Sequence, residues 1–174
     1  ETDYFVRAYA VNSEGVSYGE EKSFATLTKV DVFADKIITV NGVSFTMKAV
    51  EGGTFNMGAQ SADPAGANYD AEAWDREAPV HSVTLSDYYI GETEVTQELW
   101  QAVMGYNISH FSGEQNPAEQ VTWYDCQNFI AQINLLTGMN FRLLTEAEWE
   151  YSARGGNKSE GYIYSGSDNL EDVA

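Results

Sequence analysis

The stretch FRLLTEAEWEYSARGG, residues 141–156, specifies the start, the body and the end of one helix. Thr145 and Glu148 have the spacing of a capping box, in which each side chain accepts a hydrogen bond from the other residue's backbone amide. The pair Gly155-Gly156 ends the helix, because glycine readily adopts the backbone angles that follow a last helical turn. The sequence therefore predicts a helix that begins after Thr145 and ends before Gly155.

The side chains of this predicted helix divide into an apolar set and a charged set. Trp149 is spaced to pack on Leu144, which precedes the cap, as a hydrophobic staple. We expect Trp149 and Ala153 to face a core. Glu150 lies one turn before Arg154, the favourable acid-first order for an ion pair. The glutamates should face solvent or a neighbouring cation.

The composition indicates a globular protein that binds neither nucleic acid nor membranes. Of the 174 residues, 43% are hydrophobic, enough for one domain with an appendage. The formal net charge of −18 is the opposite of the basic footprint that phosphate backbones and anionic membrane surfaces attract. No apolar run approaches the roughly 18 residues of a membrane-spanning helix. We therefore expect no membrane insertion.

Several short strands are predicted before the signature stretch. Asn41-Gly42 is a strong hairpin signal, and it joins predicted strands at residues 37–40 and 43–50. Residues 59–78 have little periodicity and are predicted to form a long surface loop. Further strands are expected at residues 4–11, 22–26, 54–58, 81–85 and 88–90, with a turn at residues 12–15.

Two more helices are predicted, at residues 93–105 and 123–137. The second begins at a capping box formed by Thr122 and Asp125 and ends at Gly138. Apolar residues a turn apart give each helix one buried face. These faces comprise Val95, Leu99 and Val103 in the first helix, and Cys126, Phe129, Ile130, Ile133 and Leu136 in the second.

Three passages resemble the formylglycine-generating enzyme family, also called the sulfatase-modifying factor family. They are FTMKAVEGGTFNMG, HSVTLSDYYIGETEVTQELWQAVMG and the signature stretch itself, so the resemblance runs from about Phe45 onward. Leu144 departs from the family's signature, which has proline there; the change removes one fixed backbone angle. The resemblance implies an α+β domain of the C-type-lectin-like kind, loop-rich, with short strands and few helices.

A second resemblance concerns the start of the chain. The passage YFVRAYAVNSEGVSYGEEKSFAT is similar to the last two strands of a bacterial fibronectin type III-like domain. We therefore expect residues 1–27 to be the end of such a β-sandwich, 28–36 a linker, and 37–174 the N-terminal part of a sulfatase-modifying-factor-like domain. An edge hairpin of the main domain is the alternative for residues 1–27.

What the family resemblance implies about function divides into two hypotheses. Enzymes of the family oxidise a sulfatase cysteine to formylglycine with copper and oxygen, and other members are non-catalytic. The first hypothesis is that the whole protein has this activity, with a sulfatase polypeptide as partner. The second is a binding or adhesion module for a surface ligand, because fold alone does not decide function. The fibronectin-like neighbour suggests a bacterial extracytoplasmic location.

No catalytic, cofactor-binding or metal-binding residue is assigned in this chain. Cys126 is the single cysteine, so no disulfide within the chain is possible. It lies on an apolar stripe without a neighbouring cation, which predicts a buried, unreactive thiol. The resemblance places the family's paired copper-binding cysteines in the C-terminal half of its domain. Residues 1–174 by themselves should therefore be inactive.

The two histidines do not form a metal site. His81 and His110 lie far apart in sequence, and neither has a second histidine one turn away. We expect His81 to be a hydrogen-bonded structural residue and His110 to be exposed.

Two acidic segments carry the oxygen-bearing side chains that calcium prefers. Residues Asn68, Asp70, Glu72 and Asp75 lack the glycine and the distal glutamate of an EF-hand loop, so solvated acids are expected. The family's structural calcium lies near the segment containing Asp168, Asn169, Glu171 and Asp172. The matching positions, however, are Val173 and Ala174, which have no side-chain oxygen.

The signature helix carries three glutamates, which is a composition that acid–base chemistry could use. Glu146, Glu148 and Glu150 could be paired carboxylates, but capping and the ion pair with Arg154 explain two of them without chemistry. Among the tryptophans, Trp100, Trp123 and Trp149 have core spacing. Trp74, in the loop, is the one expected to contact a partner.

Overall fold

The computed structural model describes residues 2–26 and 33–173. The chain divides into two compact units, Glu1–Val32 and Phe33–Ala174, and each is described separately. Most of the predicted linker at residues 28–36 lies outside the described residues. The boundaries proposed from the sequence therefore stay a prediction.

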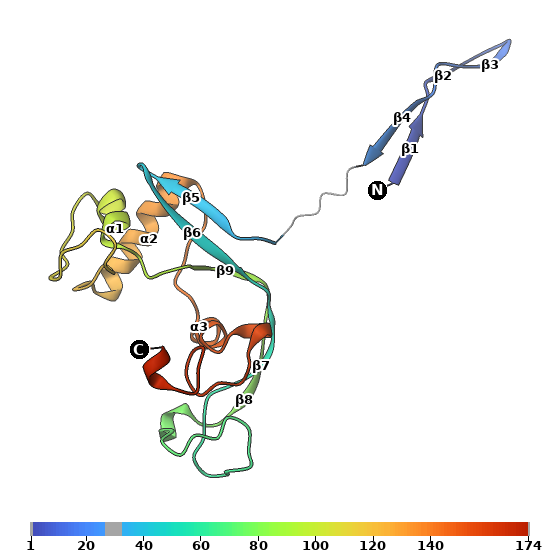
Figure 1. Ribbon diagram of the computed structural model, residues 1–174. Coiled ribbons are helices and arrows are strands. Elements are labelled where there is room, and N and C mark those ends of the chain that lie inside the picture. The colour runs from blue at the N-terminus through green and yellow to red at the C-terminus, as the bar shows by residue number, and fades with distance from the viewer. Residues whose placement is uncertain (1, 27–32, 174) are drawn as a thin grey trace. The chain divides into compact units, whose positions relative to one another are not determined.

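The first unit consists of two antiparallel strand pairs (Figure 1). Strand β1 (Thr2–Val6) pairs with β4 (Lys22–Thr26), and β2 (Tyr9–Asn12) pairs with β3 (Gly15–Tyr18). The single strand predicted at residues 4–11 is therefore wrong, and β3 was missed. The break arises because residues 7–8 lie opposite the longer segment 19–21, so the ladder cannot continue in register.

The second unit contains a three-stranded and a two-stranded antiparallel sheet. The first has the order β5-β6-β9, and the second pairs β7 with β8. The bounds are Lys36–Val40 for β5, Val43–Val50 for β6, Gly53–Met57 for β7, His81–Leu85 for β8 and Tyr88–Gly91 for β9. Asn41 and Gly42, with φ of 48° and 90°, form the hairpin turn between β5 and β6, as predicted.

Strands β6 and β7 form one long arm of a bent ribbon, and β9 and β8 form the other. Val50 pairs with Tyr88 on one side of the bend and Gly53 with Leu85 on the other. At the bend, a Cβ atom on Gly52 would lie 2.2 Å from the carbonyl oxygen of Leu85. The close approach of two backbones therefore requires glycine at position 52.

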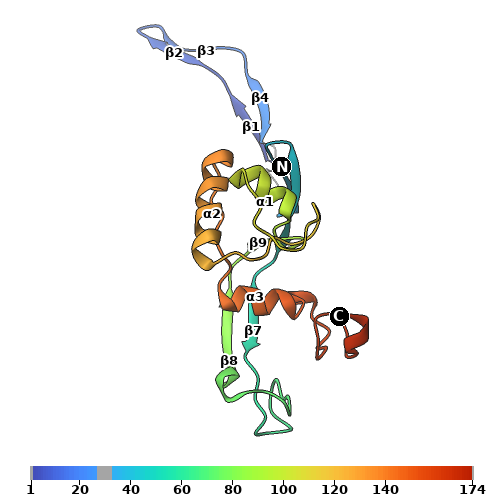
Figure 2. The same ribbon diagram turned by 90° about the vertical axis from the view of Figure 1, so that its left-hand side faces the viewer.

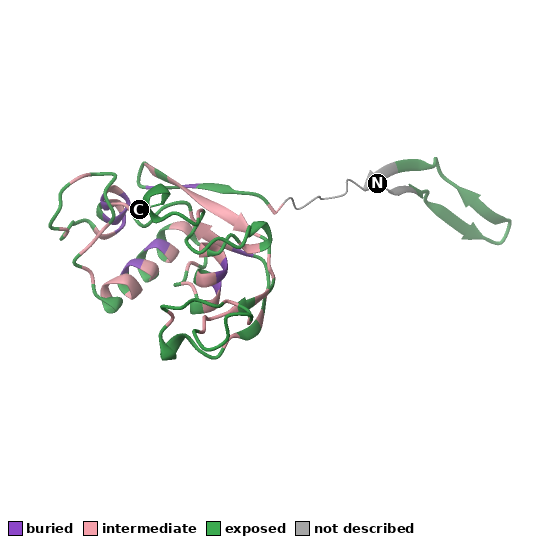
Figure 3. Ribbon diagram, turned by 60° about the horizontal axis from the view of Figure 1, so that its bottom comes forward, coloured by how far each residue is buried: buried purple, intermediate pink, exposed green. Residues whose placement is uncertain are grey.

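Helices α1 (Gln97–Met104) and α2 (Trp123–Thr137) pack against β5 and β6. Buried residues, purple in Figure 3, occupy short stretches of α1, α2 and β5, whereas β6 contributes residues that are only partly buried. Between the helices, Trp100 stacks on Phe129 with ring centroids 5.0 Å apart. The buried core cluster comprises Ile38, Val40, Leu99, Trp100, Val103, Phe129 and Ile133. Apolar contacts therefore hold α1 and α2 together and against the sheet.

Two details of these predicted helices are wrong. Val95 lies outside α1, because its carbonyl accepts a hydrogen bond from Ala118 N and Thr96 is the N-cap residue. Leu136 is 47% exposed, so it lies off the buried stripe of α2. The capping box formed by Thr122 and Asp125 is confirmed, and so is the end of α2 at Gly138.

The signature stretch forms helix α3 (Glu146–Ala153), which lies across the β7–β8 pair (Figure 2). Thr145 is its N-cap residue, and the capping box with Glu148 is present as predicted. Three short 3₁₀ helices complete the unit: η1 (Asp75–Glu77), η2 (Gly156–Lys158) and η3 (Leu170–Asp172). The long loop predicted at residues 59–78 contains the first of them. The unit is thus an α+β domain, as predicted.

Candidate functional site

The N-terminus of α3 is held by a buried carboxylate. Glu148, 7% exposed, accepts a hydrogen bond from Thr145 N at 2.8 Å, and Thr145 Oγ1 accepts one from Glu148 N at 3.2 Å. Arg142 adds a two-pronged ion pair, with Nη1–Oε2 at 2.7 Å and Nη2–Oε1 at 2.6 Å. The hydrogen bonds from the Arg142 guanidinium lower the pKa of Glu148 to about 2.

Two tyrosines fix α3 onto the bent ribbon. The Tyr88 hydroxyl of β9 donates to the carbonyl of Glu148 at 2.7 Å and lies 2.7 Å from Ser152 Oγ. The Tyr151 hydroxyl, on a side chain only 2% exposed, donates to Asn157 Oδ1 at 2.8 Å. Burial raises the pKa of both tyrosines, so both remain neutral donors.

The side chain of Asn157 connects the bend of the ribbon to α3 by hydrogen bonds. Its amide Nδ2 donates to the carbonyl of Gly52 at 2.9 Å, while its Oδ1 accepts the bond from Tyr151. A Cβ atom on Gly53 would lie 2.5 Å from both the Tyr151 hydroxyl and Asn157 Oδ1. The Gly-Gly turn of the sequence therefore gives α3 and η2 room to reach the ribbon.

The ion pair predicted at the end of α3 is present, and both of its residues also bond the backbone of Gly58. Arg154 Nε donates to Glu150 Oε1 at 2.7 Å. The same Oε1 accepts from Gly58 N at 2.9 Å, and Arg154 Nη2 donates to Gly58 O at 3.2 Å. Glu148 and Glu150 are therefore both engaged in structural contacts, and only Glu146 is exposed to solvent. This arrangement disfavours general acid–base chemistry on this helix.

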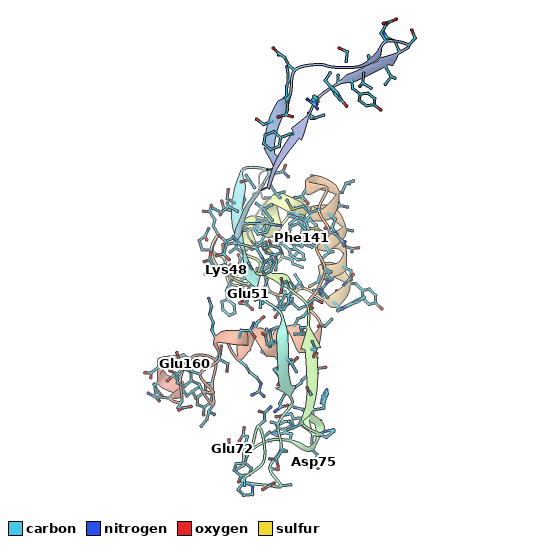
Figure 4. The ribbon with its side chains drawn as sticks, turned by 90° about the vertical axis from the view of Figure 1, so that its right-hand side faces the viewer. Lys48, Glu51, Glu72, Asp75, Phe141 and Glu160 are labelled. Carbon is cyan, nitrogen blue, oxygen red and sulfur yellow. The ribbon has the colours of Figure 1, made fainter. Side chains whose placement is uncertain are left out.

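Beside α3, an open groove of about 840 Å³ lies among β6, β9, α1, α2 and residues 141–145. Its lining is mainly apolar, and Phe141, labelled in Figure 4, contributes to it. Phe141 is tied to α2 by hydrogen bonds to Asn134, from its N to Oδ1 at 2.6 Å and from Nδ2 to its O at 3.0 Å. The groove is the candidate site, because it is the large concave surface next to the signature helix.

The structure corrects the expected burial of two residues that line this groove. Trp149 was expected to face a core but is 64% exposed, while Tyr151 takes the buried position on α3. Cys126 was expected to be buried but is partly exposed, because it lies on the groove side of α2. The fold thus brings a thiol and an indole from two separate helices into one groove.

Of the other tryptophans, Trp100 is buried as expected, at 2% exposed. Trp123 is 61% exposed, contrary to its core spacing, and its ring meets that of Tyr124 edge-on at 5.3 Å. Trp74 is 60% exposed, with the guanidinium of Arg76 over its ring at 3.8 Å. Spacing alone could not separate these cases, because three of the four sit at helical positions.

The two histidines lie in separate places. His81 Nδ1 lies 2.9 Å from the carbonyl oxygen of Pro79, so this exposed residue is hydrogen-bonded to the local backbone. His110 is exposed, its backbone amide bonds to the Glu119 carboxylate, and its ring meets Phe111 edge-on. Neither histidine lines the groove.

The acidic loop uses its polar groups to hold its own backbone. Asn68 Nδ2 donates to the carbonyls of Asn56 at 2.6 Å and Gly58 at 2.7 Å, and Asp70 Oδ1 accepts from Glu72 N at 2.9 Å. Figure 4 shows Glu72 and Asp75 in this loop, well apart from Glu160 in the C-terminal segment. Within residues 2–26 and 33–173, no three His, Cys, Asp or Glu side chains are placed to hold a metal ion.

The C-terminal acids also form local contacts. Asp168 Oδ1 accepts from Ile163 N at 2.9 Å, and Asn169 Oδ1 accepts from Glu171 N at 3.3 Å. Asp172 Oδ2 accepts from Ser167 Oγ at 3.1 Å. These groups do not converge on one point, so they do not fit a calcium site. A paired-thiolate copper site does not fit either, because the chain has one cysteine.

Comparison with known proteins defines the class. The family model described as "Sulfatase-modifying factor enzyme 1-like domain" matches residues 40–174. The chain therefore belongs to the sulfatase-modifying factor family, and its α+β fold is the fold of that family. This confirms the resemblance seen from Phe45 onward. No comparison tests the resemblance of residues 1–27 to a fibronectin type III-like domain.

Particular relatives are similar over part of their length. "Chaperone protein LppX" of Paenibacillus barcinonensis is 40% identical over 126 residues, an alignment covering 53% of this chain and 45% of the relative. The solved structure "Treponema denticola variable protein 1" has 30% identity and a TM-score of 0.61, covering 80% of this chain and 62% of that one. PvdO from Pseudomonas aeruginosa is 24% identical with a TM-score of 0.57, covering 75% and 57%, and shares the fold. The chain thus spans about half to three fifths of these relatives.

Within the described residues, no helix has the length and apolar character needed to cross a membrane.

Proposed function

We propose that residues 33–174 form a non-catalytic framework of a sulfatase-modifying-factor-like protein. In this proposal, the whole protein oxidises a sulfatase cysteine to formylglycine in an extracytoplasmic compartment. One observation supports the framework role: two of the glutamates of α3, Glu148 and Glu150, have their carboxylates engaged in hydrogen bonds and ion pairs that hold the fold. Glu148 bonds Arg142 and the helix cap, and Glu150 bonds Gly58 and Arg154.

Membership of the family supports the oxidase activity of the whole protein. The catalytic copper of such enzymes would need thiolates in addition to Cys126, so its ligands would have to come from outside residues 1–174. What residues 33–174 contribute is a rigid support. Their hydrogen bonds fix α3 against the ribbon, and a fixed support is what positioned catalytic groups require.

The test compares the whole protein with the 174-residue chain. Each is incubated with copper, oxygen, a thiol reductant and a peptide containing Cys-x-Pro-x-Arg, and the aldehyde product is measured by mass spectrometry. A peptide with alanine in place of cysteine is the control. We expect product with the whole protein alone. Product from the 174-residue chain would contradict the framework role, and no product from the whole protein would contradict the oxidase activity.

A second candidate function is binding without catalysis, and two observations favour it. One relative is named a chaperone and another a variable protein, and neither printed name mentions a sulfatase. Trp74, with its Arg76 partner, is also exposed at a loop. A whole protein that produces no aldehyde but suppresses the aggregation of a heat-unfolded test protein, measured by light scattering, would support this function. Loss of that suppression in Trp74→Ala would locate it.

A further inference from the structure

The tip of the β5–β6 hairpin is joined to helix α1 by one side chain. Asn41 Nδ2 donates a hydrogen bond to the carbonyl oxygen of Ala102 at 2.7 Å, across 61 positions of sequence. Ala102 lies in the last turn of α1, and the final carbonyls of a helix have no partner within it. This turn carries no basic side chain. Asn41 therefore supplies a donor to the end of α1 that needs one.

The same asparagine is followed by glycine, and this is the one Asn-Gly pair in the sequence. Both residues are exposed. Among the described residues, no atom beyond the chain neighbours lies within 4 Å of the place where a Cβ on Gly42 would stand. The strand ladder resumes at the pair of Val40 and Val43, so the Gly42 amide lies outside it. Water therefore reaches the Gly42 nitrogen, and no side chain shields it.

We propose that Asn41 is a deamidation site and that its conversion releases the hairpin tip from α1. The Gly42 nitrogen loses its proton to solvent and forms a bond to Asn41 Cγ. The bond from Cγ to the side-chain nitrogen breaks, and that nitrogen takes up a proton from solvent and leaves as ammonia. Water then adds to either carbonyl of the five-membered imide and opens it, which gives aspartate or isoaspartate. Water is the only co-reactant.

The product reverses the contact with α1. An aspartate carboxylate has no donor, so it and the Ala102 carbonyl oxygen would be two acceptors facing each other. The negative end of the helix dipole adds to this repulsion. Val40 is buried in the apolar cluster, and Val43 packs against that cluster. Because these two residues flank the turn, release of the tip acts on the edge of the cluster.

Peptide mapping of the whole protein tests the site. Trypsin cuts after Lys36 and Lys48, and Asn41 is the only asparagine in the peptide between them. Liquid chromatography with mass spectrometry separates the amide, aspartate and isoaspartate forms of this peptide. The protein is incubated at alkaline pH, once folded and once unfolded in urea.

We expect conversion of Asn41 in the folded protein and about fivefold faster conversion in urea, because unfolding frees the amide from a contact worth roughly one net hydrogen bond. If the folded protein kept its Asn41 amide for far longer than this factor allows, the site would be wrong. Equal rates in the two samples would overturn the protective role of the contact with Ala102.

A variant that carries the product tests the release of the tip. Asn41→Asp should lower the Tm of the whole protein by about 3–5 °C, because it loses the bond to Ala102 and adds a repelled charge. Asn41→Gly is the matched control, because it loses the same bond without adding charge and accepts the φ of 48°. It should lower the Tm by about half as much. An unchanged Tm for Asn41→Asp would overturn the release, and equal losses in the two variants would overturn the repulsion.

Discussion

The second unit holds its helices to its two sheets in different ways. Helices α1 and α2 meet β5 and β6 through an apolar cluster in which Trp100 stacks on Phe129. Helix α3 packs on β7 and β8 and is held by hydrogen bonds to the Tyr88 hydroxyl of β9, the Glu51 carbonyl at the bend and the Gly58 backbone. Apolar contacts are insensitive to direction, whereas hydrogen bonds fix orientation. The first arrangement supplies stability, and the second fixes where one helix sits.

The largest effect should follow from opening the apolar cluster. Trp100→Ala should lower the free energy of unfolding by about 3–5 kcal/mol, because it removes a buried aromatic side chain and leaves a cavity. Unfolding in urea followed by circular dichroism measures it. Trp123→Ala is the control, because Trp123 is 61% exposed, and it should change stability by less than about 1 kcal/mol.

A finer variant sharpens this prediction. Trp100 Nε1 is buried without a hydrogen-bond partner among the described residues. Trp100→Phe removes this unpaired N–H while keeping a ring against Phe129, so it should cost less than about 2 kcal/mol. Equal losses for the alanine and phenylalanine variants would show that the stacked ring does not carry the stability of this cluster.

The next largest loss of stability should follow from breaking the Arg142–Glu148 ion pair at the start of α3. Glu148→Gln should lower the free energy of unfolding by about 2–3 kcal/mol at pH 7, because it leaves Arg142 without its carboxylate and weakens the cap. Glu146→Gln, on the same turn but exposed, should change it by about 0.5 kcal/mol or less. If the two variants were equally stable, the ion pair would not hold α3.

The dependence on pH has a defined sign. Because the pKa of Glu148 falls from 4.5 to about 2 on folding, its stabilisation is present above pH 4.5 and is lost as the pH falls toward 2. The parent chain should therefore lose more stability between pH 4.5 and 2 than Glu148→Gln does. Urea unfolding at several pH values in this window measures the difference, and parallel curves would contradict it.

The smallest loss of stability should follow from removing a helix N-cap, and it should be the same for α2 in the apolar part and α3 in the hydrogen-bonded part. Thr122 and Thr145 each accept a hydrogen bond from the third helical amide, at 3.2 Å in both cases. Thr122→Ala and Thr145→Ala should each cost about 1 kcal/mol. Thermal unfolding followed by circular dichroism measures both. A much larger loss for Thr145→Ala would show that its contact with Glu148 couples the cap to the Arg142 ion pair.

Local signals allowed much of this fold to be predicted from the sequence. The hairpin at Asn41-Gly42, both capping boxes and the Glu150–Arg154 pair depend on residues within four positions of one another. Such signals can be read from the sequence because they depend on neighbouring residues and not on distant contacts. The same holds for the strand bounds of β5 and β6.

The candidate site could not be predicted in the same way, because distant segments build it. Trp149 has a staple position in sequence, yet Tyr151 is the residue that reaches Glu51 and Asn157. Helical spacing gives the face of a residue but not which face a sheet will cover. The partnership of Arg142 with Glu148 carried a weak signal: an arginine three residues before a capping threonine is within reach of the capping glutamate.

The grip on Gly58 has a consequence for the loop that follows. Glu150 and Arg154 hold the backbone of Gly58, Asn68 bonds the carbonyls of Asn56 and Gly58, and Ala59 N bonds Glu77 O at 3.2 Å. These contacts hold the two ends of the loop together. Insertions or exchanges at residues 61–67 and 71–74 should leave the scaffold undisturbed, which makes this loop a natural place for sequence diversification and for grafting foreign peptides.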